Sequence, residues 1–281
     1  MQVREALVKG AALIARSNLP SPMIDAKAIL KSILSMRDED LLRNYDQDLT
    51  AENEQAYFLS IKRRQSFEPI AYIIGMKEFY SRNFMVNSAV LIPRNDSEIL
   101  IDLVVKFYPD KNTSLEILDI GTGSGCLILT LLGEYQNAIG TAIDISRASL
   151  EVAEQNGRNL NFMKRVKFIK SDLFDELGDE RFDLIICNPP YIAENEKNLM
   201  NQETEFEPSH ALFAKEDGLY FYHKIAKEIE KYLRKGGRAI FEIGFNQQNK
   251  VAEIFQAANL VIEANEYDLE SRPRCVVIKN D

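Results

Sequence analysis

The sequence predicts an α/β protein with a mostly parallel seven-stranded sheet that ends in a C-terminal antiparallel hairpin, preceded by a small N-terminal helical bundle. The length of 281 residues suits about two domains and is enough to bury a sizeable core. Residues 1–75 carry apolar side chains at helical spacing. Beyond Pro109, short apolar runs alternate with helical patterns, which is typical of a parallel sheet covered by helices on both faces.

The N-terminal helices are predicted from spacing and from start signals. The first has an apolar face made of Val3, Leu7, Ala11 and Ile14. Ser21-Pro22 predicts the start of a second helix, since serine is a common N-cap and proline suits the first helical position. Thr50 is predicted to cap a third long helix. We therefore expect residues 1–75 to form a helical domain of their own.

A connector separates this bundle from the rest of the chain. Residues 76–92 contain short runs of β-forming residues and predict a β-hairpin connector. Asn95 and Glu98 have the spacing of a capping box and predict the start of a helix. We expect the second domain to span residues 93–281.

The second domain is predicted to contain seven strands and four further helices. The strands are expected at residues 115–120, 139–145, 166–169, 182–187, 238–243, 260–267 and 274–278. The helices are expected at residues 126–135, 147–159, 218–234 and 247–258. The last two strands are joined by only a short connection, so they are predicted to pair as the antiparallel hairpin.

Composition excludes several classes of protein. A hydrophobic fraction of 46% with 27% charged residues is ordinary for a soluble globular chain, and no segment resembles a membrane span or signal peptide. Three distant cysteines and two histidines argue against a disulfide framework or a metal site and fit the cytoplasm. Residues 1–75 hold ten basic and ten acidic residues, so the remainder carries the whole net charge of -9. That acidity argues against a wide nucleic-acid surface.

A glycine-rich loop follows the first predicted strand of the sheet. Asp119 and Ile120 lead into Gly121-Thr122-Gly123-Ser124-Gly125, where glycines allow a tight turn and a close approach of backbone to ligand. A dinucleotide fingerprint would need glycine at position 126, where this chain has Cys126. The pattern looks instead like the S-adenosylmethionine loop of Rossmann-like methyltransferases. A strand-to-helix turn without a ligand is the alternative.

Acidic residues follow the next two predicted strands. Asp144 could accept hydrogen bonds from both hydroxyls of a ribose, or it could cap the following helix. Asp172 could meet the adenine amino group and Leu173 the adenine ring. A solvated acid and a core leucine are the alternatives for these two residues. We expect all three to belong to the cofactor site.

Asn188-Pro189-Pro190-Tyr191 follows the fourth predicted strand, at the sheet edge where α/β proteins bind ligands. Consecutive prolines stiffen the backbone, so the Asn188 side-chain oxygen and the Pro189 carbonyl can together hold both hydrogens of one –NH₂ group. Tyr191 offers a flat face to a planar amide or base. Orienting such a nitrogen is what its methylation requires, so Asn188, Pro189 and Tyr191 are predicted to be catalytic. A rigid surface turn is the alternative. Cys187, which precedes the motif, is interpreted as inert core.

Taken in order, these motifs resemble the peptide chain release factor glutamine methyltransferases, the HemK/PrmC family of class I methyltransferases. Five further segments carry the resemblance, namely Glu68-Pro69, Leu91-Ile92-Pro93-Arg94, Glu207-Pro208, Asp217-Gly218-Leu219 and Glu242-Ile243-Gly244. The resemblance implies a Rossmann-like methyltransferase that modifies the glutamine of the Gly-Gly-Gln motif in release factors, giving N(5)-methylglutamine. It implies that residues 121–125, Asp144 and Leu173 bind S-adenosylmethionine. It also implies that residues 188–191 bind the glutamine, with Asn188 beside the transferred methyl, and that residues 1–75 dock the release factor.

The chain departs from the family pattern at Asn95, Ser97, Ala214 and Lys215, and it lacks the aromatic residue that some members have at Leu173. None of these changes removes an atom that the expected chemistry needs. We expect a cytoplasmic enzyme that uses no metal and acts as a monomer on release factors, without membrane or direct nucleic-acid partners. The alternative is an amino-group methyltransferase acting on adenine or guanine in DNA or RNA, which usually adds a basic recognition surface.

Overall fold

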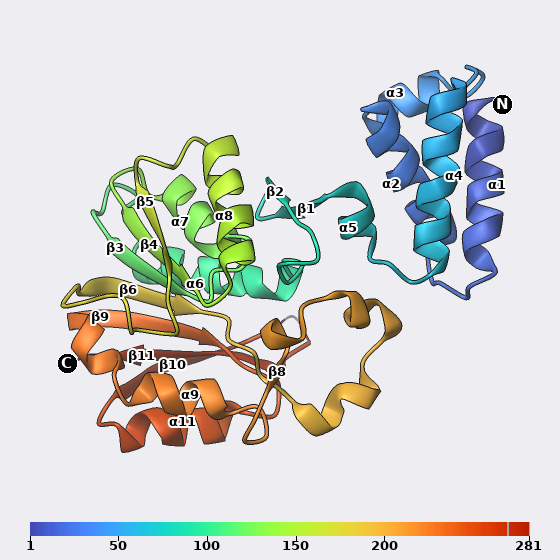
Figure 1. Ribbon diagram of the computed structural model, residues 1–281. Coiled ribbons are helices and arrows are strands. Elements are labelled where there is room, and N and C mark those ends of the chain that lie inside the picture. Colours follow the sequence, from blue (N-terminus) through green and yellow to red (C-terminus); the bar gives the residue numbers. More distant parts are fainter. Residues whose placement is uncertain (269, 281) are drawn as a thin grey trace. The chain divides into compact units, whose positions relative to one another are not determined.

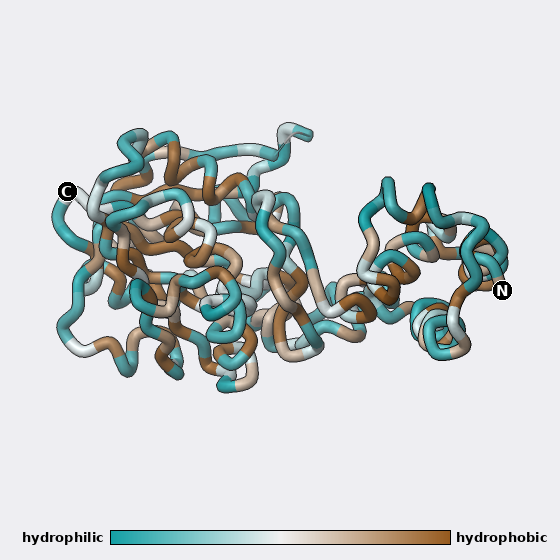
Figure 2. Tube along the Cα trace, turned by 90° about the horizontal axis from the view of Figure 1, so that it is seen from above, coloured by the Kyte–Doolittle hydropathy of each residue, from teal (hydrophilic) through white to brown (hydrophobic). Residues whose placement is uncertain are grey.

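The computed structural model describes residues 1–268 and 270–280, and the chain divides into two compact units (Figure 1). The first unit comprises Met1–Met76 together with the short segment Asn201–Phe206. The second comprises Lys77–Met200 and Glu207–Asp281. Along both units, hydrophobic stretches alternate with hydrophilic ones, as expected for elements with one buried face (Figure 2).

The first unit is helical. Its helices are α1 (Val3–Ala15), α2 (Pro22–Leu34), α3 (Asp38–Arg43), α4 (Ala51–Gln65) and α5 (Ile70–Ile74). The side chains predicted to form the apolar face of α1 are buried in one cluster with residues of α2 and α4. The two short helices α3 and α5 escaped prediction because five or six residues show too little periodicity.

The start signals of these helices differ in outcome. Thr50 caps α4 as predicted, since its hydroxyl accepts a hydrogen bond from the Asn53 amide at 3.2 Å. Ser21 occupies the N-cap position of α2, but its side chain makes no capping hydrogen bond. Pro22 at the first helical position therefore marks this start, because its missing N–H needs no partner there.

The second unit opens with a small hairpin, β1 (Met76–Phe79) and β2 (Arg82–Met85). A 3₁₀ turn, η1 (Asn95–Ser97), then leads into α6 (Glu98–Phe107). The predicted capping box is wrong. Glu98 instead accepts a hydrogen bond from the Tyr80 amide at 2.8 Å, and Asn95 accepts one from Lys77 at 3.1 Å. Hydrogen bonds from the hairpin to Asn95 and Glu98 have replaced the bonds that a capping box would make within the helix end.

A seven-stranded sheet forms the centre of the second unit, as predicted, in the order β10-β11-β9-β6-β3-β4-β5. Its strands are β3 (Glu116–Ile120), β4 (Ile139–Asp144), β5 (Val166–Lys170), β6 (Phe182–Cys187), β9 (Leu233–Glu242), β10 (Val261–Tyr267) and β11 (Pro273–Lys279). The strands from β9 to β5 run parallel, whereas β11 pairs antiparallel with both β9 and β10. Strand β9 begins at Leu233, five residues before the prediction, and two short helices, Tyr220–Ala226 and Ile229–Tyr232, stand in place of the single helix expected at 218–234.

Helices cover both faces of this sheet. They are α7 (Cys126–Glu134), α8 (Arg147–Asn159), α9 (Tyr220–Ala226), α10 (Ile229–Tyr232) and α11 (Gln248–Ala257) in addition to α6. Helices α6, α7 and α8 lie on one side and α9 and α11 on the other (Figure 1). Alternate strand residues enter separate cores, with Ile117 on the α6–α7 side and Leu118 on the α9–α11 side.

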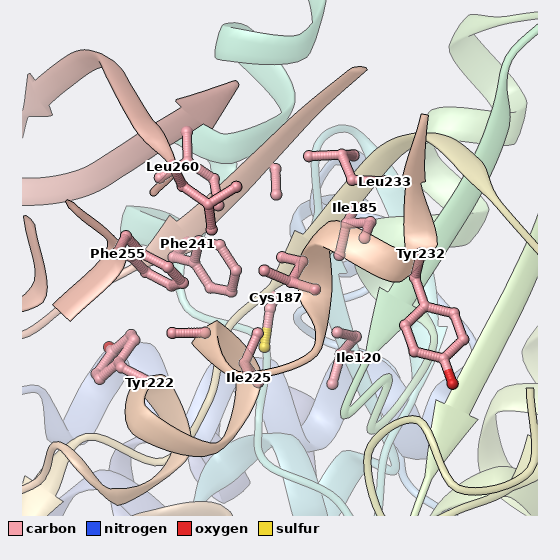
Figure 3. Close-up of a cluster of buried hydrophobic side chains, with 14 of the residues drawn as sticks. Ile120, Ile185, Cys187, Tyr222, Ile225, Tyr232, Leu233, Phe241, Phe255 and Leu260 are labelled. Carbon is pink, nitrogen blue, oxygen red and sulfur yellow. The ribbon is translucent and has the colours of Figure 1, made fainter. Parts of the chain in front are cut away.

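The core on the α9–α11 side is rich in aromatic rings. Phe241 of β9 lies against Phe255 of α11 with ring centroids 4.7 Å apart (Figure 3). Cys187 is buried in this core, and burial raises the pKa of its thiol well above the ordinary value, so the thiol is neutral and unreactive.

Short elements complete the loop region between β6 and α9. They are β7 (Ile192–Ala193), η2 (Glu194–Leu199), η3 (Gln202–Phe206), η4 (Ser209–Ala211) and β8 (Phe213–Ala214), with β7 and β8 paired in parallel. Within residues 1–268 and 270–280, no helix is long and apolar enough to span a membrane.

Candidate active site

A cavity of about 200 Å³ opens at the carboxyl ends of the parallel strands. Its wall collects residues that follow β3, β4, β5 and β6, together with residues 89–91 and the segment at His210 and Ala211. Eight residues predicted as site residues line it, namely Gly121, Gly123, Asp144, Asp172, Leu173, Asn188, Pro189 and Pro190. The topology brings them together because parallel strands end at the same sheet edge.

The glycine loop presents bare backbone to this cavity. Gly121 has φ +71°, and no atom lies within 4 Å of the Cβ that another residue would place there. Gly123 has φ +55°, and the nearest atom to its added Cβ would be 4.0 Å away. A side chain at either position would both strain the backbone and occupy the open space. The loop is therefore shaped for a ligand that lies directly on its main chain.

The other three residues of the loop hold its shape. Thr122 donates its hydroxyl to the buried carboxylate of Asp119 at 2.6 Å, and the Ser124 carbonyl accepts from Asn156 of α8 at 2.9 Å. A Cβ on Gly125 would lie 3.0 Å from Leu129, so glycine there permits the close packing of α7. The sequence assigned these residues to the cofactor. The structure places them behind the two glycines that line the cavity.

Asp144 ends β4 with both carboxylate oxygens at the cavity. One oxygen accepts a hydrogen bond from the Gly123 amide and the other from the Ser146 amide, each at 2.9 Å. Burial raises the pKa of Asp144, and those two amides oppose the rise by stabilising the charged form. Ser146 is the N-cap of α8, accepting from the Ser149 amide at 3.2 Å. The capping alternative for Asp144 is thus excluded, and each of its oxygens keeps a lone pair for a ligand.

Asp172 and Leu173 follow β5 on the cavity wall. Leu173 adopts φ +51°, a left-handed conformation that a branched side chain rarely takes. The Ser171 hydroxyl stabilises it by donating to the Leu173 carbonyl at 2.7 Å. The Leu173 side chain packs partly against the aromatic core while also lining the cavity. Local backbone strain held by a specific hydrogen bond is characteristic of binding sites.

Asn188 lies at the end of β6 and is held by a network of buried polar groups. Its Nδ2 donates to the Ser97 Oγ at 3.1 Å, and the Ser97 hydroxyl donates to the Glu242 Oε2 at 2.5 Å. The second carboxylate oxygen, Oε1, accepts from the Tyr191 hydroxyl at 3.1 Å. Strands β6 and β9 are parallel neighbours with Cys187 opposite Phe241, which brings Asn188 and Glu242 to adjacent strand ends.

Tyr191 is fixed at both its ring and its backbone. Burial raises the pKa of its hydroxyl far above the ordinary value, so the hydroxyl stays protonated and donates to Glu242. Its carbonyl accepts from the Gln247 Nε2 at 2.9 Å. Gly218 lies so close that an added Cβ would be 2.1 Å from this carbonyl oxygen. The Asn-Pro-Pro-Tyr segment is therefore rigid on both of its sides.

A second buried acid holds the segment that precedes α6. Glu207 accepts from the Ile92 amide at 3.1 Å and pairs with the Arg94 guanidinium at 2.5 Å. Sequence reasoning assigned no role to Glu207, Ser97 or Glu242. A signal was present for Glu242, because a carboxylate within the apolar run 239–243 is rarely buried without a purpose. No cluster of histidine, cysteine or acidic side chains suited to a metal ion occurs among residues 1–268 and 270–280.

Comparison with known proteins agrees with this geometry. Residues 96–270 match the Methyltransferase small domain family, and residues 5–75 match the PrmC N-terminal domain family. The chain is 35% identical to the release factor glutamine methyltransferase of Koribacter versatilis, covering 99% of this chain and 98% of that protein.

Longer relatives match as well. The chain is 40% identical to a bifunctional methyltransferase of Rickettsia bellii, an alignment that covers 98% of this chain and 54% of the relative. The chain thus spans about half the length of the first curated relatives it matches. A methyltransferase structure from Pyrococcus furiosus superposes with a TM-score of 0.54 at 15% identity, covering 83% of this chain and 100% of that one, which shows the shared fold.

Proposed function

Because this chain belongs to the release factor glutamine methyltransferase family, we propose that it transfers a methyl group from S-adenosylmethionine to the side-chain nitrogen of a glutamine in a peptide chain release factor. The glutamine is that of the Gly-Gly-Gln motif, and the product is N(5)-methylglutamine. One observation carries the proposal. Asn188, with its NH₂ group committed to Ser97, lines the same cavity as the bare glycine backbone and Asp144.

The residues of the cavity fit the cofactor. The open space at Gly121 and Gly123 suits an adenosyl and methionyl group lying on the loop. The free lone pairs of Asp144 suit the two ribose hydroxyls, since an ionised carboxylate only accepts hydrogen bonds. Asp172 and Leu173 suit the edge and face of the adenine ring. When bound, the cofactor supplies an electrophilic methyl group on a positively charged sulfur.

The remaining residues act on the substrate amide. The Asn188 Oδ1 and the Pro189 carbonyl accept its two N–H hydrogens, which aims the nitrogen at the methyl group. These acceptors also favour the form of the amide in which positive charge grows on nitrogen during transfer. Pro190 stiffens the backbone, and Tyr191, which is not among the residues that line the cavity, anchors the segment through its hydrogen bond to Glu242. As its bond to the methyl carbon forms, the amide nitrogen would release one proton to solvent, and the electron pair of the broken carbon–sulfur bond would stay on the sulfur of S-adenosylhomocysteine.

The release factor is the proposed macromolecular partner. The match of residues 5–75 to the PrmC N-terminal domain supports a docking role for the helical unit. Residues 76–281 carry the whole net charge of -9. This acidity of the predicted catalytic domain favours a protein substrate over a nucleic-acid backbone. We propose the cytoplasm as the place of action, because release factors take part in translation there.

The test uses recombinant chain, methyl-labelled cofactor and purified release factor. We expect one methyl group on one glutamine, located by peptide mass spectrometry, and none on a release factor whose Gly-Gly-Gln glutamine is alanine. Asn188→Ala should lose most transfer while still binding cofactor, whereas Asn137→Ala, at an exposed asparagine remote from the cavity, should behave as wild type. Label entering DNA or RNA instead of the release factor would overturn the proposal.

A further inference from the structure

The Asn188 side chain is one end of a chain of two hydrogen bonds that runs through Ser97 to Glu242. Asn188 follows β6, Ser97 belongs to η1, and Glu242 ends β9. Ser97 is 3% exposed and Glu242 is 1% exposed, so water does not compete for their hydrogen bonds. The link between Ser97 and Glu242 joins residues 145 positions apart, and three separate segments must therefore fold together to complete it.

The direction of each hydrogen bond follows from counting donors. An ionised carboxylate can only accept, so the single hydroxyl hydrogen of Ser97 is used by Glu242, at the short distance of 2.5 Å. With its hydrogen used, the Ser97 oxygen can only accept from Asn188. The end of the Asn188 amide that faces Ser97 is therefore the NH₂ group, in agreement with the 3.1 Å contact of Nδ2.

That direction decides what Asn188 offers on its other side. An asparagine amide can be turned by half a revolution with almost no change in shape, which exchanges a hydrogen-bond donor for an acceptor. With Nδ2 on Ser97, the oxygen Oδ1 remains for the cavity. In the reversed state an NH₂ group would face the NH₂ group of a substrate amide, and two donors form no hydrogen bond.

We propose that Ser97 and Glu242 are positioning residues that fix the direction of the Asn188 side-chain amide, so that an acceptor and not a donor faces the substrate nitrogen. This inference rests on the proposed function for the identity of the substrate amide. The direction itself rests only on the hydrogen bonds of this chain.

The neighbours of Glu242 act on the charge of its carboxyl in both directions. Burial raises the pKa of this carboxyl, while hydrogen bonds from Ser97 and Tyr191 and the positive charge of Arg274 act in the opposite direction. Arg274 is itself held near Glu242 by ion pairs with Asp96 at 3.2 Å and Asp268 at 3.0 Å. Two donors and one nearby cation thus offset part of the cost of burying the charged acid.

Ser97→Ala removes the link to Asn188 together with one of the two hydrogen bonds that the Glu242 carboxylate accepts. We expect kcat for a release factor to fall about 10- to 100-fold, because Asn188 loses its fixed direction, with KM changed less and the dissociation constant of the cofactor unchanged. Ser97→Thr keeps the hydroxyl and should restore kcat to within about threefold of wild type. Thr130→Val is the matched control, since it removes a buried hydroxyl of α7 that has no hydrogen-bond partner, and should leave kcat unchanged.

A second measurement does not depend on activity. The side-chain NH₂ resonance of Asn188, assigned by its disappearance in Asn188→Ala, should exchange slowly with solvent in wild type and at least about tenfold faster in Ser97→Ala. Fast exchange in wild type would show that the NH₂ group faces the cavity and would overturn the inference. A Ser97→Ala variant with wild-type kcat, or with low kcat and unchanged exchange, would also overturn it. If wild type leaves release factors unmodified, the proposed function fails, and the exchange measurement alone decides the direction of the amide.

Discussion

Gly218 lies 27 residues after Tyr191 in the sequence and is not among the residues that line the cavity, yet we predict that Gly218→Ala disables methyl transfer. The glycine adopts φ +83°, where a Cβ would lie 2.1 Å from the Tyr191 carbonyl oxygen and 2.6 Å from the Gln247 Nε2. The Gln247 amide donates to that same carbonyl. The added methyl group would therefore disrupt the hydrogen bond from Gln247 to the Tyr191 carbonyl, which holds the end of the Asn-Pro-Pro-Tyr segment.

Two separable costs follow from this geometry. The left-handed backbone costs about 1–2 kcal/mol for any residue with a Cβ. The contact with Tyr191 must also lengthen by about 1 Å, and a displacement of that size at a reacting centre can reduce the rate by about 10²-fold. Gly236 provides the control, because its φ of +76° imposes similar strain while none of the residues that the structure describes has an atom within 4 Å of its added Cβ. Gly236→Ala should thus show the first cost alone.

The assay measures thermal stability, cofactor affinity and kcat for both variants. A loss of 1–2 kcal/mol corresponds to a fall in melting temperature of about 2–8 °C for a unit of this size, and we expect both variants to show it. Cofactor affinity should be close to that of wild type in both, whereas kcat should fall only in Gly218→Ala. The reasoning is refuted if Gly218→Ala keeps the kcat of Gly236→Ala, or if its loss of activity is explained by a loss of cofactor binding.

Three further perturbations probe the helical unit, the loop and the cofactor site. Arg64→Ala should destabilise the chain by about 3–5 kcal/mol in urea unfolding, because it leaves the buried Asp25 carboxylate unpaired. Arg63→Ala, which removes a partly exposed ion pair, should cost less than about 1 kcal/mol, and equal losses would contradict this reasoning. Burial raises the pKa of Asp119 to about 7, so its ionisation opposes folding and stability falls as pH rises from the unfolded value near 4 through 7. Asp119→Asn should therefore gain about 2–3 kcal/mol relative to wild type between about pH 5 and pH 8, and a pH-independent difference would disprove the shift. Asp144→Ala should weaken cofactor binding by about 10- to 100-fold in calorimetry, while unchanged affinity would remove Asp144 from the site.

The strands of the sheet were predictable because a buried strand needs a run of apolar residues, which the local sequence shows directly. A parallel strand covered on both faces needs a nearly continuous apolar run, and the runs ending at Ile120, Asp144 and Cys187 fit this pattern and are buried. The start of β9 was not predictable. Leu233 and the residues that follow include two glycines and look like a helix end, and only pairing with Phe182 of β6 makes them a strand. Such pairing is a tertiary property that no local window contains.

The candidate site likewise contains residues that the sequence could predict and residues whose roles depend on tertiary contacts. Gly121, Asp144 and Asn188 each follow a predicted strand, so topology alone predicts that they gather at one sheet edge. Ser97 and Glu242 belong to segments far from Asn188 in sequence, and their contact depends on how η1 packs against the end of β9. The capping box predicted at Asn95 failed for a related reason, because hairpin residues supplied better partners than the local backbone.

The need for this buried pair follows from a difference between the two proposed acceptors. A carbonyl such as that of Pro189 is an acceptor whatever surrounds it, and the adjacent proline removes the nearest competing donor. The side-chain amide of Asn188 has a donor NH₂ on one side and an acceptor oxygen on the other, and it can be flipped. Its neighbours must therefore determine which of the two faces the substrate. A serine hydroxyl tied to a carboxylate does this, because the carboxylate consumes its hydrogen. Ser97 is one of the positions at which the chain departs from the family pattern, and it carries a hydroxyl. That hydroxyl supplies the one atom on which the direction of Asn188 depends.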